Sequence, residues 1–346
     1  MPAVITASSV LCAGGRGTEQ LWATVRAGIS CIKSSSLVDR SAEPIQMGLV
    51  PASAIPPLPP ELQSQPLPSG VRRMLQLAGS TLSAVGEAAG AAPLTVYLGL
   101  PQLDPSAVPW LANFLSLLSG CAALPIDLAS SRIFPMGRAA AILALEASLE
   151  TLSQNPSAII VVGGVDTFLD LGRVAALDAE KRILGPRVMD GFIPGEGAAF
   201  SVIRGPTAMA NNPTPSTARI EGAATTLDPG HRYGSAPARG EGLAQAIDKL
   251  RASTSIGAVA STFAGFNGEN FEAKLWGVAR LRHTDFFSPS MVLQHPADCI
   301  GDTGAATGAI LTAVASFALS AGQREGPSFI WAASDHELRG CSLLSK

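Results

Sequence analysis

The stretch CIGDTGAATGAI, residues 299–310, is a glycine-rich turn that runs into an alanine-rich apolar segment, with Asp302 at the junction. The pattern predicts a helix from about Thr303 to Leu319. An aspartate just before a helix can accept hydrogen bonds from free backbone N–H groups, which contributes about 1 kcal/mol. The helix dipole adds about 0.3–1 kcal/mol. The residues around Asp302 therefore predict a helix cap at this position.

Short apolar runs alternate with helical patterns on both sides of this stretch. Such alternation is typical of βαβ units with a parallel or mixed sheet covered by helices. The strand-like runs are AVITASSV, LTVYLGL, AIIVVGGV, AAFSVI, TARIEGAA, IGAVAST and SFIWAAS. The clearest helical spacing covers residues 138–152, and other helices are expected at 71–89, 241–252 and 271–282.

Two irregular stretches interrupt the alternation. Residues 51–69 are rich in proline and predict an extended surface loop without a helix. Residues 205–217 predict an irregular link between two halves, residues 1–204 and 218–346, packed as one unit.

Composition excludes several classes of function. The 346 residues carry a formal net charge of −3, which offers no general basic field for a nucleic-acid backbone. No apolar run reaches the length of a membrane span, and the N-terminal run predicts a buried strand. The cysteines are five, scattered and never in a CxxC pair, which argues against a disulfide framework and a zinc site. A cytoplasmic, reducing compartment fits this pattern.

The common catalytic motifs are absent from the sequence. It contains no GxxxxGK[ST] motif, no HExxH motif and no GxSxG motif, so we expect no cofactor and no metal. It contains four histidines, which limits any mechanism that depends on paired histidines: His231, His283, His295 and His336.

Three segments, read in order, carry a resemblance to a known family. They are AIIVVGGVDTFLD (158–170), DGFIPGEGAAFSVI (190–203) and IGDTGAATGAI (300–310). Together they resemble the β-ketoacyl synthases of the thiolase superfamily, whose segments read AGG(T/A)(D/E), RDGFVxGEGAG and GHTxGAAG. Their order and spacing suit that family over most of the chain.

The resemblance implies a duplicated thiolase-like α/β fold. Each half would follow the order βαβαβαββ, and two mixed sheets would enclose buried helices in five α-β-α-β-α layers. Family members normally form side-by-side dimers. The chain is shorter than a typical member, so some cap or interface segments would be trimmed.

The family's catalytic residues have no equivalent at the matching positions. The nucleophilic cysteine would fall within Phe134, Pro135, Met136 and Gly137, none of which can attack a thioester. In STFAGFNGENFEAK, the residues Gly268, Glu269 and Glu272 match the tail of the family pattern HGTxTxxGDxxE, which puts the first histidine near Ser261 or Thr262. The second histidine aligns with Asp302, and the phenylalanine gate GFGG aligns with ASDHELRG at residues 333–340.

The resemblance and the lost residues leave three hypotheses. The first is a non-condensing partner, similar to a chain length factor, that pairs with itself or with an active β-ketoacyl synthase and works with an acyl carrier protein. Phe134 or Met136 would then fill or shorten the vestigial pocket. The second is an acyltransferase or thioester hydrolase with a relocated centre built from Asp302 and His336, or from Ser130 or Ser131 in a shifted register. The third is a scaffold or adaptor protein that reuses the fold.

Overall fold

The computed structural model describes residues 3–90, 93–103, 109–211 and 215–346. Ten of its strands form two groups of five, one from each half of the chain. In the first half the strands are β1 (Ala3–Cys12), β5 (Thr95–Gly99), β6 (Arg132–Phe134), β7 (Ile159–Thr167) and β8 (Glu196–Arg204). In the second half they are β9 (Ala218–Leu227), β10 (Val259–Ala264), β11 (Phe287–Gln294), β12 (Ser328–Ala333) and β13 (Leu338–Ser345).

Both halves arrange their five strands in the same order. From the outer edge the first half runs β6-β5-β7-β8-β1, and the second half runs β11-β10-β12-β13-β9. The two outermost pairings of each half are parallel and the two innermost are antiparallel. A three-residue antiparallel contact between β1 and β9 joins the two groups into one hydrogen-bonded sheet. The chain is therefore a structural duplication.

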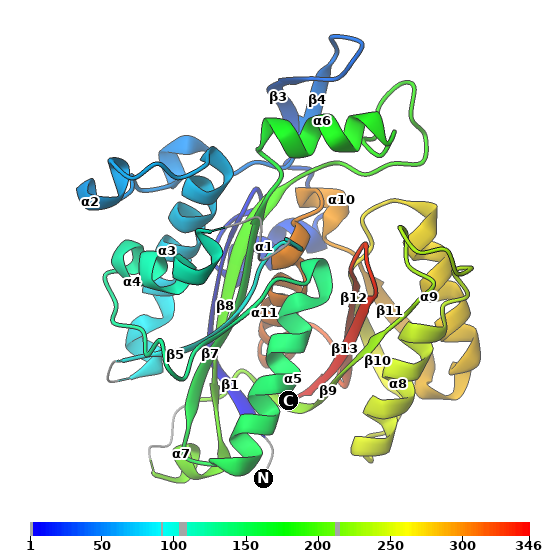
Figure 1. Cartoon of the computed structure of the whole chain (residues 1–346). Helices are drawn as coiled ribbons and strands as arrows, with labels where there is room; N and C mark the ends of the chain where they lie inside the picture. The colour runs from blue at the N-terminus through cyan, green and yellow to red at the C-terminus, as the bar shows by residue number, and fades with distance from the viewer. Residues whose placement is uncertain (1–2, 91–92, 104–108, 212–214) are drawn as a thin grey trace.

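Two buried helices lie between the two strand groups (Figure 1). Helix α5 (Ala140–Gln154) packs on β5 and β7 of the first half and on β9 and β13 of the second. Helix α11 (Thr307–Ser320) packs on β8 and on β12. Most residues of α11 are buried, because the helix is apolar on every side and packs against strands and other helices.

Further helices cover the two outer faces. Helices α3 (Ser69–Ala89) and α4 (Phe114–Ala122) pack together on the first half, and α8 (Glu241–Ser253) and α9 (Asn270–Arg282) pack together on the second. The layers are thus α-β-α-β-α, and the predicted five-layered α/β architecture is confirmed.

The remaining elements lie mainly at the ends of these layers. They are the strand β2 (Gly15–Arg16), the hairpin β3 (Lys33–Val38) and β4 (Pro44–Met47), and helices α1 (Thr18–Arg26), α6 (Leu171–Ala179) and α10 (Ala297–Ile300). No helix in the described part of the chain is both long and apolar enough to span a lipid bilayer.

Two predictions about irregular segments were wrong in part. The proline-rich segment 51–69 contains a one-turn helix, α2 (Pro60–Gln63), because proline is tolerated in the first turn, where its missing N–H has no helical partner. Helix α7 (Pro206–Asn211) likewise occupies part of the segment 205–217 that was expected to be irregular. Residues 212–214 of that segment lie outside the described residues.

Candidate functional site

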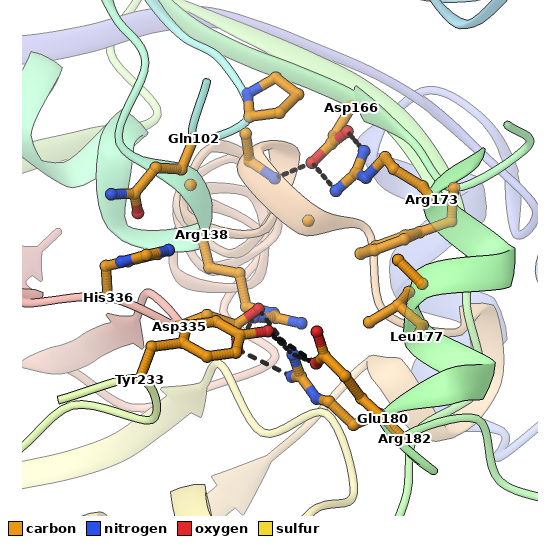
Figure 2. A pocket seen from close by; sticks show the side chains of 16 residues that line it. Gln102, Arg138, Asp166, Arg173, Leu177, Glu180, Arg182, Tyr233, Asp335 and His336 are labelled. Atoms are coloured by element: carbon orange, nitrogen blue, oxygen red, sulfur yellow. Dashed lines mark hydrogen bonds and ion pairs between the residues drawn. The ribbon is translucent and has the colours of Figure 1, made fainter. Parts of the chain in front are cut away.

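A cavity of about 210 Å³ lies where the buried helices of the two halves begin (Figure 2). Its floor contains Gly137 and Arg138 from the first half and Gly304 and Ala305 from the second. The other lining residues come from the end of β7, from the loops after β5 and β7, from α6 and its following loop, and from two loops of the second half: Pro101, Gln102, Asp166, Phe168, Arg173, Ala176, Leu177, Glu180, Arg182, Tyr233, Asp335 and His336.

Each buried helix begins with a 3₁₀ turn that starts at a glycine. The turn Gly137–Ala139 precedes α5, and the turn Gly304–Ala306 precedes α11. Gly137 has φ 76° and Gly304 has φ 54°, a backbone region that favours glycine. A Cβ atom on Gly304 would also lie 2.0 Å from Asp166 Oδ2. The two halves therefore present the same backbone feature to the cavity.

A buried ion pair connects the two helix starts. Arg138 Nε donates to Asp302 Oδ2 at 2.8 Å, and Arg138 Nη2 donates to the same oxygen. Arg138 is 4% exposed and Asp302 is 2% exposed. Burial opposes the positive charge of Arg138, but Asp302 and Asp335 outweigh it and raise the pKa of Arg138 well above its usual value. Arg138 is therefore charged, and Asp302 is the carboxyl group to which it donates.

The pair belongs to a larger group of buried and half-buried charges, named here the ion-pair cluster. Asp335 lies 2.8 Å from Arg138 Nη1 and accepts from Arg182 Nη2 at 2.8 Å. Arg182 also donates to both oxygens of Glu269, at 2.9 and 2.8 Å. The members are Arg138, Arg182, Arg232, Glu269, Asp302 and Asp335. Arg138 and Arg182 come from the first half and every carboxylate comes from the second, so the cluster holds the halves together.

Two carboxyl groups in this region have pKa values that are shifted in opposite directions. Burial would raise the pKa of Asp335, but Arg138 and Arg182 outweigh it and hold the pKa well below its usual value. Glu272 lies beside the cluster, and burial raises its pKa to about 8, while Arg138 lowers it and Asp302 and Asp335 raise it further. At neutral pH the Glu272 side chain is therefore mostly protonated.

Side-chain oxygens accept hydrogen bonds from backbone N–H groups at both helix starts. Asp302 Oδ1 accepts from Gly304 N at 2.8 Å, and Asp166 Oδ2 accepts from Ala305 N at 2.8 Å. Ser334 Oγ accepts from Ala139 N at 3.1 Å and donates to Met136 O at 2.5 Å. Asp302 thus accepts from the first N–H of the 3₁₀ turn, but the N-cap positions of this turn and of α11 are Thr303 and Ala306, neither of which makes a side-chain cap bond. The ion pair of Asp302 with Arg138 was not predicted. These N–H groups are not free to bind a developing oxyanion.

Three of the sequence-derived candidates lie at or beside the cavity. Gly137 and His336 line it, and Asp302 lies behind Arg138. The His336 ring packs on Tyr233, with 5.0 Å between ring centroids, and on His231, with 5.6 Å. Asp335 and Asp302 both contact Arg138, so Asp335 joins Asp302 through a cation.

Two apolar candidates do not fill the cavity. Phe134 and Met136 pack against the central hydrophobic core, and neither lines the cavity. Phe134 contacts the Tyr97 ring at a centroid distance of 5.9 Å. The side chain that projects between the two helix starts is instead Arg138, immediately after the four positions considered for the nucleophile.

Ser261 and Thr262 do not lie in the loop that follows their strand. Strand β10 continues to Ala264, so both residues are buried inside it. Ser261 Oγ hydrogen-bonds to Ser328 Oγ at 2.6 Å, and Thr262 Oγ1 contacts Met291 Sδ at 2.8 Å. The strand is longer than its sequence pattern indicated, which is why both residues lie inside it. The following loop instead contributes Asn267, which donates to Asp302 at 3.4 Å.

The candidate nucleophiles Ser130 and Ser131 lie at the other end of β6. Ser131 precedes the strand, and its Oγ accepts from Val96 N at 2.9 Å. Gly137 and the cavity follow the end of the strand. The structure does not bring either serine to the cavity, and no group of three metal-ligating side chains occurs among the described residues.

Comparisons with known proteins place this geometry in a structural class. No protein-family model matches the sequence, and no curated protein matches it. Solved structures do match. A ketosynthase from module 6 of the bacillaene synthase of Bacillus subtilis 168 has a TM-score of 0.79 at 14% identity, over 100% of this chain and 72% of that chain.

Two further matches extend over almost the full length of both proteins. The ishigamide ketosynthase/chain length factor has a TM-score of 0.76 at 15% identity, over 100% of this chain and 99% of that chain. A type II PKS ketosynthase, solved in complex with its acyl-carrier protein, has a TM-score of 0.77 at 14% identity, over 99% of each chain. The chain therefore has the fold of ketosynthases and chain length factors.

Proposed function

We propose that this protein is a non-condensing homologue of the β-ketoacyl synthases that acts, like a chain length factor, as the partner of an active synthase in acyl-chain synthesis. The observation that carries the proposal is the Arg138–Asp302 ion pair between the starts of the two buried helices. Synthases of this fold need a nucleophile at the first helix start and histidines that stabilise charge nearby. A guanidinium and a carboxylate that neutralise each other supply neither function.

Three contacts around the pair support the proposal. Ser334 Oγ occupies the N–H of Ala139 at the start of the first helix, where an acyl oxyanion would need a donor. At the start of the second helix, Asp302 Oδ1 and Asp166 Oδ2 likewise accept from the N–H groups of Gly304 and Ala305. Arg138 and Arg182 already donate to carboxylates of the ion-pair cluster, which supports a structural role for these two side chains.

The proposed partner is an active β-ketoacyl synthase, with an acyl carrier protein delivering the chain. Strand β6 is the outer edge of the first strand group and has only three residues. An unpaired sheet edge favours pairing with another chain. A side-by-side homodimer or heterodimer through this edge is the arrangement we propose, which makes the present chain one wall of a shared acyl tunnel.

A relocated catalytic centre is less well supported by the geometry. Ser130 and Ser131 lie away from the cavity, and Ser131 Oγ is engaged by Val96 N. His336 has aromatic neighbours, and Asp302 is held by Arg138. None of these groups forms the nucleophile and base pair that thioester hydrolysis requires.

Assays with and without an active partner test the proposal. The purified protein should neither release carbon dioxide from a malonyl thioester nor condense it with an acyl thioester. Mixed with an active synthase from the same genome, it should form a stable complex and change the length of the acyl products. Condensation by the isolated protein, or an unchanged product length despite a complex, would contradict the proposal.

A further inference from the structure

Two cysteines that are distant in the sequence are joined by a backbone hydrogen bond just before the turn that carries Asp302. The backbone N–H of Cys31, in the loop after α1, donates to the carbonyl of Cys299 in α10 at 2.7 Å. Backbone bond lengths and angles on either side of this hydrogen bond then limit the two Cα atoms to a separation of about 6.6 Å or less. Disulfide bridges have Cα separations of about 4.4–6.8 Å. The two backbones are therefore already at a distance that a disulfide can span.

The pKa values of Cys299 and Cys12 are both affected by Cys31, which is consistent with a short distance between the thiols. Burial raises the pKa of Cys299, and the neighbouring Asp298 and Cys31 raise it further. Burial likewise raises the pKa of Cys12 to about 12, with a smaller contribution from Cys31. Cys31 therefore lies near two other thiols, of which Cys299 is the one joined to it through the backbone.

Accessibility separates the two partners into an attacking and a resolving thiol. Cys31 is partly exposed and follows four exposed residues, 27–30, whereas Cys299 is 5% exposed. The backbone beside Cys299 is fixed, because a Cβ atom on Gly48 would lie 1.7 Å from Ile300 O. An oxidant in solvent reaches Cys31 first, and the exposed loop rather than α10 adjusts to form a bridge.

We propose that Cys31 and Cys299 form a reversible disulfide when the protein meets a peroxide. The Cys31 thiolate attacks one oxygen of hydrogen peroxide, the O–O bond breaks, and the departing oxygen takes a proton to leave as water. The Cys299 sulfur then attacks the sulfenic acid of Cys31, an S–S bond replaces the S–O bond, and a second water leaves. Two thiols are oxidised and one peroxide is reduced to two waters.

The bridge would act on the ion-pair cluster through α10. Only Gly301 separates α10 from Asp302, so a bridge at Cys299 ties the segment before Asp302 to the loop after α1. The closed loop is long, which favours a large restriction of the unfolded chain. The oxidised protein should therefore melt at a higher temperature than the reduced protein. This modification does not depend on the proposed function.

Peptide mapping under non-reducing conditions tests the proposal. The reduced protein is treated with hydrogen peroxide, its free thiols are alkylated, and it is digested without reduction. A cross-linked peptide pair containing Cys31 and Cys299, removed by dithiothreitol, is expected, together with a higher melting temperature. Cys31→Ser and Cys299→Ser should each abolish this pair, and Cys121→Ser should leave it unchanged.

Two results of the same experiment would overturn the proposal. One is oxidation of Cys31 to a sulfinic or sulfonic acid with Cys299 still alkylated in the parent protein. The other is a bridge between Cys31 and Cys12. Both are read from the parent protein, so they do not depend on whether a variant folds.

Discussion

The starts of the two buried helices share a backbone and differ in their charges. Both follow the third strand of their half, both begin with a glycine at positive φ, and both continue through a 3₁₀ turn. At the first start Arg138 follows the glycine, whereas at the second Asp302 precedes it by two residues. The duplicated fold therefore fixes where two side chains meet, and the local sequence decides what they do there.

The chemistry of this meeting point explains why the cluster is both costly and stable. Two buried charges lose their hydration, which offsets much of their attraction. Removing one partner is far more damaging than never having the pair, because the other charge remains buried. The contrast between the two helix starts can therefore be tested by replacing Arg138 and Asp302 separately.

Replacing Arg138 should have the largest effect. Arg138→Ala leaves Asp302 buried without its main cation and weakens the compensation of Asp335. We expect a loss of about 3–5 kcal/mol in the free energy of unfolding, measured by urea denaturation. The exposed Arg280 is a matched control, and Arg280→Ala should change stability by about 0.5 kcal/mol or less. Equal losses in the two variants would contradict a special role for Arg138.

Ionisation of Glu272 should affect stability through pH. The folded pKa of about 8 lies above the ordinary value of 4.5, so between these values the unfolded chain ionises while the folded chain keeps its proton. Stability is full below the ordinary pKa and should fall as pH rises towards 8, by up to about 1.4 kcal/mol per pH unit. Glu272→Gln should remove this dependence in melts recorded across the range. A steeper fall of stability with pH in the glutamine variant would contradict the assignment of this dependence to Glu272.

The amide variant of Asp302 separates its two roles. Asparagine keeps an acceptor for Gly304 N–H but removes the charge that faces Arg138. A cap alone predicts almost no loss of stability. The ion pair predicts a loss of about 1.5–3 kcal/mol. Denaturation of Asp302→Asn beside the parent measures the difference, and an unchanged midpoint would reduce Asp302 to a cap.

Changes at the two serines should have the smallest effects. Ser131→Ala removes the acceptor for Val96 N and should cost about 0.5–1.5 kcal/mol. Ser130→Ala, on the exposed surface, should cost about 0.5 kcal/mol or less. Neither should alter acyl-thioester hydrolysis. Hydrolysis that disappears in one of these folded variants would support a relocated centre.

The sequence predicted the layers well because they follow local patterns. The apolar runs and helical spacings located seven of the ten strands, both inner helices, and α3, α8 and α9 of the outer layers, but not α4. Three strands were missed: β6, which has only three residues, β11, which contains Pro289 and lies at an edge, and β13, whose polar residues Arg339 and Ser342 are nevertheless buried. Burial of such residues depends on neighbouring strands, which no local pattern records.

The candidate site could be predicted only in part. Asp302, Gly137 and His336 were found from their positions in motifs, and all three lie at or beside the cavity. Arg138 was missed, although a charge at the start of an apolar helix is itself a signal. Its partners are 164 and 197 residues away, so the pairing depends on the duplication and not on spacing.

Acylation is the most direct measure of whether the first helix start carries a nucleophile. The purified protein is incubated with acyl-thioesters beside an active synthase as a positive control, and intact masses are recorded. Because an ion pair occupies the position between the helix starts, the chain should stay at its unmodified mass while the synthase gains one acyl group. A stable acyl adduct on this chain, mapped to any residue that lines the cavity or to Ser130 or Ser131, would contradict the account.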